Sequence, residues 1–549
     1  MNRFSLTVIA LYSAIPCVFA KKAPVVSRPK LVVGLVIDQM RWDYLYRYSA
    51  QYGNRGFKRL LKDGFNCQNT MINYLPSFTA PGHTCIYTGS VPAIHGIAAN
   101  DWYDNFNGRP DKKIYCTDDT AVQTVSEGSS TKKPMSPKNL LVTTITDELR
   151  LATNFQSRVF GVALKDRGSI LPAGHLANGA FWLDTGTGLF CSSTYYKKPS
   201  PDWLHTFNKR KVADSLINLD WTLLDPTKAI YTQSLQDDNK KYEGNFKGEA
   251  APVFPHSIKA LKGGELYDAF ERFPGGNTLT LKMAEACRDG ELLGQGTATD
   301  FLCVSLSSTD YAGHQFAPNS IEIEDEYIRL DKEIADFLDY LDATVGRGNY
   351  LFFLTADHGA AHNPQFLIDS GINAGYVAGT IKKELNTFLA AKFGISPVSQ
   401  FFNYQVYIND SIVTAATADR DKIKMSIIDW FGKRPETAFV ADMEHIERTT
   451  IPEPLRTMIT NGYNRQRSGC IQVIPAPGWY EGYGTTGTTH GTWNPYDTHI
   501  PLLWYGWGIP KGETHAVVNM TDISATLAAL LNIQMPNGCI GKPIVELIK

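Results

Sequence analysis

The chain of 549 residues exceeds the usual size of one domain, so we expect one large core with insertions, or two domains. Its composition, 43% hydrophobic and 20% charged, excludes the disordered and fibrous classes of protein. The 53 basic and 55 acidic residues give a net charge of −2, which argues against a nucleic acid as macromolecular partner.

The first twenty residues have the pattern of a secretory signal peptide. Arg3 supplies a positive charge, an apolar run extends from Phe4 to Ile15, and small residues near Ala20 suit cleavage. The run is short for a membrane span, and no later segment has the pattern of one. Cys17 follows "AIP", a poor match to a lipoprotein signal. We therefore predict cleavage of residues 1–20 and export of residues 21–549 to the periplasm or the medium, without stable membrane insertion.

Five apolar runs have the length and β-branched content of buried strands. In chain order they are "LVVGLVI" before Asp38, "RVFGVAL" before Lys165, "FLCVSLSSTD" through Asp310, "NYLFFLTADHG" through Asp357, and "HIPLLWYGWGI" from His499. Helical patterns lie between them. One follows Asn319 or Ser320 as cap and stops at Gly346, and another follows Thr521 as cap. This alternation predicts an α/β fold with a largely parallel sheet.

Two regions depart from the alternation. Residues 190–277 are rich in Trp, Tyr, Lys, Pro and Asp, and we interpret them as a cap insertion. Residues of about 400–470 contain a strand–helix–strand pattern, which predicts a small α+β subdomain.

Nine cysteines include Cys17, so eight remain after cleavage at the predicted site. An even number permits disulfides in an exported protein but does not define their pairing. Cys85 and Cys303 lie in apolar runs, where buried free thiols are equally compatible with the sequence. No CxxC pair is present, which disfavours a cysteine-based zinc site.

Polar residues stand where the predicted strands end, the edge at which α/β sheets bind ligands. Asp38 follows a wholly apolar run, where a carboxylate needs a cap, a hydrogen bond or a metal. Asp357 and His358 are adjacent after another run. Each of these residues taken alone is also compatible with a capping role.

Two further segments add candidate metal ligands. Asp310 and His314 are four residues apart, so both can face one ion, and His490 lies in the Gly/Thr-rich loop "TTGTTHGTWNP". Together with Asp38, Asp357 and His358 they make three Asp and three His. A mixed set of this kind suits zinc, with manganese or iron as lesser alternatives, and six ligands suit two ions.

A hydroxyl and three donors complete the candidate site. Thr79, two residues before Pro81, is a helix cap or a nucleophile that a metal activates. Lys165 and Arg167 are two residues apart, so on an extended chain both side chains would project from the same face. They could bind phosphoryl oxygens there, or they could be surface charges beside a loop. Asn100 could donate its amide to another oxygen or serve in a turn.

The motifs together resemble a known family. Asp38 with "SFTAPGHTCIYTG", "HGIAANDWYD", "LKDRGSILPAGH", "STDYAGH", "ADHG" and "THG" resembles the alkaline phosphatase superfamily, most closely the bacterial periplasmic phosphate-irrepressible enzymes of flavobacterial type. The matching motifs run in order from Asp38 to about Gly541, and residues 190–277 match least. The resemblance implies that residues 21–549 form an alkaline phosphatase-like catalytic domain. The fold implied is a three-layer sandwich, with helices on both faces of a largely parallel sheet.

The resemblance also implies roles for the candidate residues. One Zn²⁺ would be held by Asp310, His314 and His490, and a second by Asp38, Asp357 and His358 together with the Thr79 hydroxyl. Thr79 would be the nucleophile, forming a phosphothreonine intermediate, while Asn100, Lys165 and Arg167 would bind the phosphoryl oxygens. His83, His95, His175 and His362 have no metal role assigned and are expected to be structural or to contact the metal ligands from behind. The expected substrates are small-molecule phosphate monoesters, and the expected state is a monomer.

The same residues distinguish three alternative functions. A sulfatase needs a C/S-x-P-x-R motif, whereas this chain has Thr79-Ala80-Pro81-Gly82-His83. A nucleotide pyrophosphatase/phosphodiesterase shares the threonine and the "HGI" segment but usually lacks the cationic pair, so Lys165 and Arg167 favour a monoesterase. A non-catalytic, metal-containing periplasmic binding protein would not need both a nucleophile and a complete ligand set.

Overall fold

The computed structural model describes residues 27–548, except 105–108, 129, 131–132, 236–238 and 483. The predicted signal peptide, residues 1–20, therefore lies outside the described residues.

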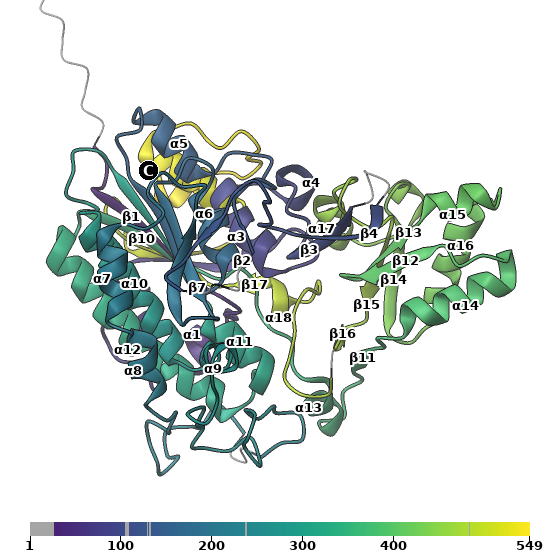
Figure 1. Ribbon diagram of the computed structural model, residues 1–549, viewed down its shortest axis with the longest axis horizontal. Helices are drawn as coiled ribbons and strands as arrows, with labels where there is room; N and C mark the ends of the chain where they lie inside the picture. The colour runs from purple at the N-terminus through teal and green to yellow at the C-terminus, as the bar shows by residue number, and fades with distance from the viewer. Residues whose placement is uncertain are drawn as a thin grey trace, which may run out of the picture.

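A mixed eleven-stranded sheet occupies the centre of the larger lobe (Figure 1). Its strands in spatial order are β17 (His499–Ile500), β2 (Phe65–Met71), β18 (Leu502–Gly506), β10 (Tyr350–Thr355), β1 (Leu31–Ile37), β9 (Asp300–Leu306), β6 (Val159–Ala163), β7 (Gly179–Asp184), β8 (Leu189–Ser193) and β5 (Thr124–Val125), and β19 (Gly512–Asn519) pairs with β2. The five strands from β10 to β7 are parallel, whereas β18 and β8 run antiparallel to their inner neighbours. The predicted α/β fold is confirmed, and the parallel order holds at the centre of the sheet.

The central strands are buried along their whole length, which explains their unbroken apolar sequences. Every residue of β1, β9 and β10 is buried. The predicted strand from His499 breaks at Pro501 into β17 and β18, because proline has no N–H to donate to a ladder.

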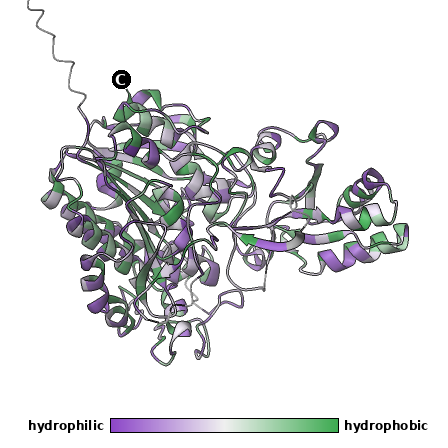
Figure 2. Ribbon diagram, turned by 45° about the horizontal axis from the view of Figure 1, so that its top comes forward, coloured by the Kyte–Doolittle hydropathy of each residue, from purple (hydrophilic) through white to green (hydrophobic). Residues whose placement is uncertain are grey.

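Helices cover both faces of the sheet, so the main lobe has three layers (Figure 1). One face carries α2 (Phe57–Asp63), α7 (Asp202–Lys209), α8 (Val212–Ile217), α10 (Gly275–Gly290) and α12 (Ile321–Leu341). The other carries α3 (Thr79–Thr88), α5 (Ile145–Ala152), α6 (Asp166–Ala173) and α19 (Asp522–Leu531). Figure 2 shows hydrophobic residues concentrated in the central strands and mixed colours on the surrounding helices.

The close approach of α3 to the sheet depends on Gly34 of β1. A Cβ at this position would lie 2.4 Å from the hydroxyl oxygen of Tyr87 in α3 and 2.5 Å from the ring of Phe353 in β10. Glycine thus lets α3, which begins at Thr79, pack directly on the centre of the sheet.

Both predicted helices form, with different caps. The hydroxyl of Ser320 accepts a bond of 3.3 Å from the N–H of Ile323 at the start of α12. A π-helical turn, Asp342–Gly346, then continues the helix to the predicted stop. Thr521 occupies the cap position of α19 but makes no cap bond with its side chain. Instead Asp522 accepts from the N–H of Asn519 at 2.9 Å.

A smaller four-stranded sheet lies to the right in Figure 1. Its order is β12 (Val398–Phe402), β13 (Gln405–Ile408), β15 (Ile471–Pro475) and β14 (Thr437–Asp442), and α14 (Ile381–Phe393), α15 (Asp410–Ala415) and α16 (Arg420–Phe431) lie beside it. It has a hydrophobic cluster of its own, including Leu385, Val406 and Ile427. The assignment of residues 400–470 as a separate subdomain stays a prediction.

The stretch 190–277 packs into the core of the main lobe. Trp221, Phe246 and Phe270 belong to the same hydrophobic cluster as the central strands. The interpretation of residues 190–277 as a cap insertion stays a prediction.

The remaining elements are short. They are α1 (Tyr44–Arg47), α4 (Pro92–His95), α9 (Gly264–Phe270), α11 (Ser308–Phe316), α13 (Pro364–Asp369), α17 (Leu455–Gly462), α18 (Pro495–Thr498), the 3₁₀ turns Ile446–Arg448 and Val545–Leu547, and the paired strands β3 (Asp101–Asp104) with β4 (Arg109–Tyr115) and β11 (Gly375–Val377) with β16 (Trp479–Glu481). Among the described residues, no helix combines the length and the apolar character needed to span a membrane.

The described part of the chain contains no disulfide bond. Its eight cysteines are free, and all of them except Cys539 are buried. The alternative of buried free thiols at Cys85 and Cys303 is therefore the one observed.

Candidate metal centre and active site

The predicted ligands meet where the central parallel strands end. Asp38 directly follows β1, while Asp357 and His358 come just after β10. Asp310 lies in α11, the short helix that follows β9. Since β10, β1 and β9 are parallel neighbours, their carboxyl ends share one edge of the sheet.

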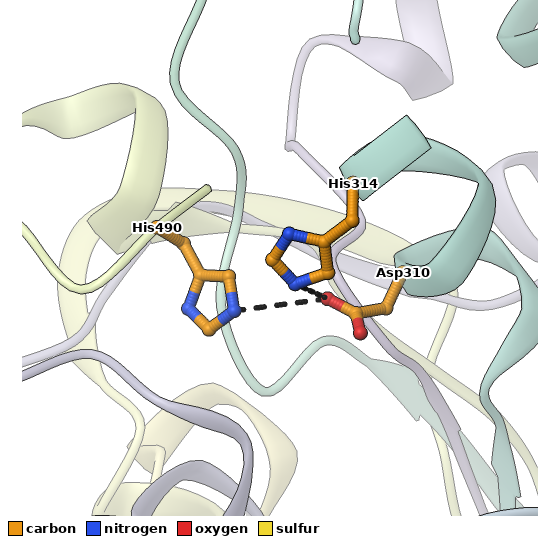
Figure 3. Close-up of side chains that lie close together, drawn as sticks. All are labelled: Asp310, His314 and His490. Carbon is orange, nitrogen blue, oxygen red and sulfur yellow. Dashed lines mark ion pairs between the residues drawn. The ribbon is translucent and has the colours of Figure 1, made fainter. Parts of the chain in front are cut away.

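The side chains form two groups, each able to hold one metal ion. The first is Asp310, His314 and His490, drawn in Figure 3, and the second is Asp38, Asp357 and His358; within each, the ligand atoms lie within 4.8 Å of one another. In the first group, Asp310 Oδ1 is 3.2 Å from His314 Nε2 and 3.7 Å from His490 Nε2. In the second, His358 Nε2 is 3.4 Å from Asp38 Oδ1 and 3.5 Å from Asp357 Oδ2.

These distances suit a tetrahedral ion. Ligands placed about 2.1 Å from such an ion stand about 3.4 Å from one another. The four measured separations lie around this value, so the two groups need little rearrangement to accept an ion each.

The histidines are held with the correct nitrogen toward the groups. Each Nδ1 bonds a backbone carbonyl: His314 to Thr488 O at 2.8 Å, His490 to Ser77 O at 2.8 Å, and His358 to Gly359 O at 3.0 Å. A carbonyl only accepts, so Nδ1 carries the proton and Nε2 keeps the lone pair that a metal requires. Burial lowers the pKa of His358 and of His490, which keeps both rings neutral.

The carboxylates of the site require cations. Burial, followed by the charges of Asp310 and Asp357, raises the pKa of Asp38 well above its usual value, despite Lys165. Asp38 Oδ1 is buried without a hydrogen-bond partner in the described part of the chain. Nζ of Lys165 donates to Asp38 Oδ2 at 2.7 Å and also to Asp310 Oδ2. One ammonium beside three buried carboxylates leaves negative charge that metal ions would balance.

The two groups are adjacent. The rings of His358 and His490, one from each group, stack with centroids 3.4 Å apart and an interplanar angle of 12°. Two ions bound here would therefore share one site.

The hydroxyl of Thr79 faces the second group. Its Oγ1 lies 3.3 Å from His358 Nε2, and the residue is buried. Thr79 is the first residue of α3, Phe78 is the cap residue, and no side chain makes a cap bond there. The alternative interpretation of Thr79 as a helix cap is therefore wrong.

The geometry of the cationic pair differs from the prediction. Lys165 and Arg167 do not lie on an extended chain, because β6 ends at Ala163 and α6 begins at Asp166. Lys165 is the cap residue of α6 and reaches the carboxylates, whereas Nη1 of Arg167, in the first helical turn, donates to the hydroxyl of Tyr115 at 3.0 Å.

Asn100 lies beside Thr79. Its Oδ1 accepts a bond of 2.8 Å from the N–H of Ala80, the residue after Thr79. Because the carbonyl oxygen of the amide is used in this way, its NH₂ is the group left to donate.

Comparisons with known proteins give matches in both sequence and structure. A sequence model of the type I phosphodiesterase / nucleotide pyrophosphatase family matches residues 32–497. The chain is 48% identical over 530 residues to the alkaline phosphatase PafA of Elizabethkingia meningoseptica, with 96% of each chain covered. The crystal structure of wild-type PafA matches with a TM-score of 0.91, covering 95% of this chain and 100% of that one. The chain belongs to the alkaline phosphatases of this family.

Two other relatives are of similar identity. The alkaline phosphatase PhoV of Synechococcus elongatus is 50% identical over 524 residues, with 95% of this chain and 94% of PhoV covered. A Myroides odoratus protein named calcium-transporting ATPase is 52% identical over 528 residues, with 95% of each chain covered.

The sequence did not single out Gln39, which links both ligand groups of this alkaline phosphatase. Its Nε2 donates to Asp310 Oδ1 at 2.6 Å, and its N–H donates to Asp357 Oδ1 at 3.2 Å. Gln39 has a left-handed φ of 65°, uncommon for a residue other than glycine. A Cβ on Gly313 would lie 1.9 Å from Gln39 Oε1, so this glycine makes room for it. In the sequence, the position of Gln39 directly after Asp38 was the one feature that could have indicated its place in the site.

The histidines predicted as structural stand outside both ligand groups. His83 is the nearest of them: its Nδ1 lies 2.9 Å from Thr79 O and 3.2 Å from Asp357 Oδ2, and its Nε2 bonds Ser305 Oγ at 2.8 Å. The other three, which bond protein groups elsewhere, are His95, His175 and His362.

Proposed function

We propose that this alkaline phosphatase uses two zinc ions and the Thr79 hydroxyl to hydrolyse phosphate monoesters through a phosphothreonine intermediate. Hydrolysis of phosphate monoesters is the activity of the alkaline phosphatases that are 48–50% identical to this chain. The observation that carries the fuller proposal is a pair of adjacent Asp/His groups, with their Nε2 lone pairs free, and one buried threonine hydroxyl beside the second group.

The ligand assignment follows the two groups. Asp310, His314 and His490 would hold one ion, and Asp38, Asp357 and His358 the other, with Thr79 Oγ1 beside it. Mixed carboxylate and imidazole donors in groups of three suit zinc. When bound, the ions would supply positive charge that stabilises the attacking and leaving oxygens.

The chain's own residues then carry out two displacements. In the first, the Thr79 hydroxyl gives up its proton to solvent and Oγ1 bonds to phosphorus, while the ester P–O bond breaks and the leaving alkoxide takes a proton from water to depart as the alcohol. In the second, water attacks phosphorus, the bond to Thr79 Oγ breaks, and inorganic phosphate is released with the hydroxyl restored. Asn100, Lys165 and Arg167 would donate to the non-bridging oxygens throughout.

A solved variant of a relative agrees with this choice of residues. A crystal structure of PafA carries four substitutions together, at a threonine, an asparagine, a lysine and an arginine. These are the four residue types that we assign to the nucleophile and the three phosphoryl donors of this chain.

A diesterase is the second candidate, because the matching family model is that of phosphodiesterases and nucleotide pyrophosphatases. A monoester dianion carries one more negative charge than a diester, so two cations in the site favour the monoester. A non-catalytic metal-binding protein is disfavoured by the complete nucleophile and ligand set.

The test is metal analysis combined with turnover of an aryl phosphate monoester and the matched diester by one preparation. We expect two zinc ions per chain and a strong preference for the monoester. A preference for the diester would favour the second candidate, and zinc-loaded protein without turnover of either would favour a binding role. We further propose that the mature chain is monomeric and is exported to the periplasm or the medium.

A further inference from the structure

We propose that Tyr115 is a positioning residue, which holds the Arg167 guanidinium in the orientation needed to bind the transferring phosphoryl group. This inference rests on the proposed role of Arg167. It adds to that role a residue on a separate segment of the chain, in the small β3–β4 hairpin.

Tyr115 connects Arg167 to the buried carboxylate of Asp166. Nη1 of Arg167 donates to the Tyr115 hydroxyl oxygen at 3.0 Å, and the same hydroxyl donates to Asp166 Oδ1 at 3.0 Å. The second oxygen of Asp166 accepts from Thr117 Oγ1 at 2.6 Å. Both Asp166 and Thr117 are buried. The phenol thus accepts from a cation and donates to an anion, which fixes its hydroxyl in one orientation.

The positions of these residues explain why a bridge is needed. Asp166 and Arg167 are consecutive residues in the first turn of α6. Neighbours in a helix project in different directions, so the carboxylate is not suited to orient the adjacent guanidinium itself. Tyr115 is the last residue of β4, which approaches from outside the helix and contacts both side chains.

Arg167 keeps donors for a ligand. Its Nε is buried and has no hydrogen-bond partner in the described part of the chain. A buried donor without a partner is costly, and the fork of a guanidinium matches the oxygens of a phosphoryl group. Tyr115 takes Nη1 and thereby sets the plane in which the other donors lie.

Tyr115 stays able to donate at alkaline pH. Burial raises the pKa of its phenol well above the usual value, although the nearby Arg167 opposes the shift. The hydroxyl therefore retains the proton that it gives to Asp166.

The experiment compares Tyr115→Phe, Arg167→Ala and the double variant, using the zinc-loaded full chain with an aryl phosphate monoester and its matched diester. We expect Tyr115→Phe to lower kcat/KM about tenfold for the monoester and less than about twofold for the diester. In the Arg167→Ala background, the same substitution should change monoester kcat/KM less than about twofold.

Tyr340→Phe is the matched control. The hydroxyl of Tyr340, in α12, also donates to an aspartate, Asp289 Oδ1 at 2.6 Å. Neither residue belongs to a ligand group. We expect unchanged kinetics for this variant, and Tyr115→Phe should keep two zinc ions and an unchanged circular dichroism spectrum.

Three results would overturn the inference. The first is that Tyr115→Phe lowers monoester kcat/KM as much in the Arg167→Ala background as in the unaltered chain. The second is that Tyr115→Phe lowers kcat/KM equally for the monoester and the diester. The third is that Tyr115→Phe keeps full monoester activity although Arg167→Ala loses it. Full monoester activity of Arg167→Ala would instead contradict the proposed function of Arg167, which separates the two failures.

Discussion

At the scale of single residues, the role proposed for the Thr79 hydroxyl depends on a cation beside it. A threonine hydroxyl is a weak nucleophile until a base or metal removes its proton. His358 Nε2 lies 3.3 Å from Thr79 Oγ1 and also 3.4 Å from Asp38 Oδ1. The same lone pair cannot serve fully as base and as metal ligand, so we assign it to the metal.

Replacement of Thr79 tests this assignment. Thr79→Ala should reduce monoester kcat by at least about a thousandfold and abolish trapping of a phosphoenzyme, because the nucleophile is removed. Both ions should remain, since each group keeps its three Asp/His ligands. The measurements are burst kinetics, mass spectrometry of the trapped enzyme and metal analysis. Thr88→Ala, near the far end of α3, is the control. A phosphorylated peptide that excludes residue 79 would contradict the proposal.

At the scale of elements, the first metal group depends on contacts between three segments. The N–H of Gly487, in the loop that carries His490, donates to Tyr242 O at 2.6 Å. The N–H of Gly244, in the same stretch as Tyr242, donates to Gln315 O at 2.8 Å, next to His314. Residues 240–246 therefore connect the two segments that carry the candidate ligands His314 and His490.

Gly487 should be intolerant of a side chain. Its φ is +69°, and a Cβ would lie 1.7 Å from the carbonyl oxygen of His314. Gly487→Ala should displace α11 from the loop, lower zinc content toward one ion per chain and reduce monoester kcat/KM at least about a hundredfold. Gly508→Ala is the control, because Gly508 has a φ of +70° but no atom near an added Cβ. Two tightly bound ions in Gly487→Ala would contradict this account.

At the scale of the whole molecule, a buried charged cluster joins residues 249–256 to α12. His256 Nδ1 lies 3.1 Å from Glu249 Oε1, and its Nε2 lies 3.2 Å from Glu322 Oε1. Burial lowers the pKa of His256, but its bonds to Glu249 and Glu322 outweigh this and raise it to about 9. The protonated ring therefore stabilises the docking of this stretch on the main lobe.

This cluster predicts a dependence of stability on pH. The folded pKa is raised, so the stabilisation is fully present below about pH 6.5 and is lost as the pH rises through about 9. It corresponds to about 3 kcal/mol, measurable as the fall in the free energy of unfolding over that range. In His256→Gln, the free energy of unfolding should fall less between about pH 6.5 and 9 than in the unaltered chain. His515→Gln, which removes an exposed histidine beside Glu513, should not. If the free energy of unfolding depended on pH equally in His256→Gln and in the unaltered chain, His256 would not be the group responsible.

Metal removal should also act on the whole fold. Asp38, Asp310 and Asp357 are buried at the ends of three central strands, and Lys165 is the cation that contacts two of them. Extraction of zinc with a chelator should therefore lower the melting temperature by several degrees, and zinc should restore it along with activity. Thr79→Ala should show the same dependence of melting temperature on zinc. A melting temperature unaffected by the chelator, with zinc demonstrably removed, would count against charge balance by the ions.

Local sequence determined the strands, the long helix and the chemical identity of the site. The runs before Asp38 and through Asp310 and Asp357 are apolar enough to be buried on both faces, so their polar ends were visible without a structure. Thr79, Asn100 and His490 were found from motifs, because their residue types and order resemble those of one family.

Tertiary structure decided what depends on segments far apart in the chain. The antiparallel pairing of β18 with β10 is a choice of partner that local pattern does not encode. Gln39, Tyr115 and the tautomers of the three ligand histidines are defined by hydrogen bonds to groups up to several hundred residues away. Lys165 and Arg167 diverge because α6 starts between them, a boundary set by packing on the sheet. Chemistry could be read from residue types and spacing, whereas orientation required the folded chain, because each orienting partner is supplied by another segment.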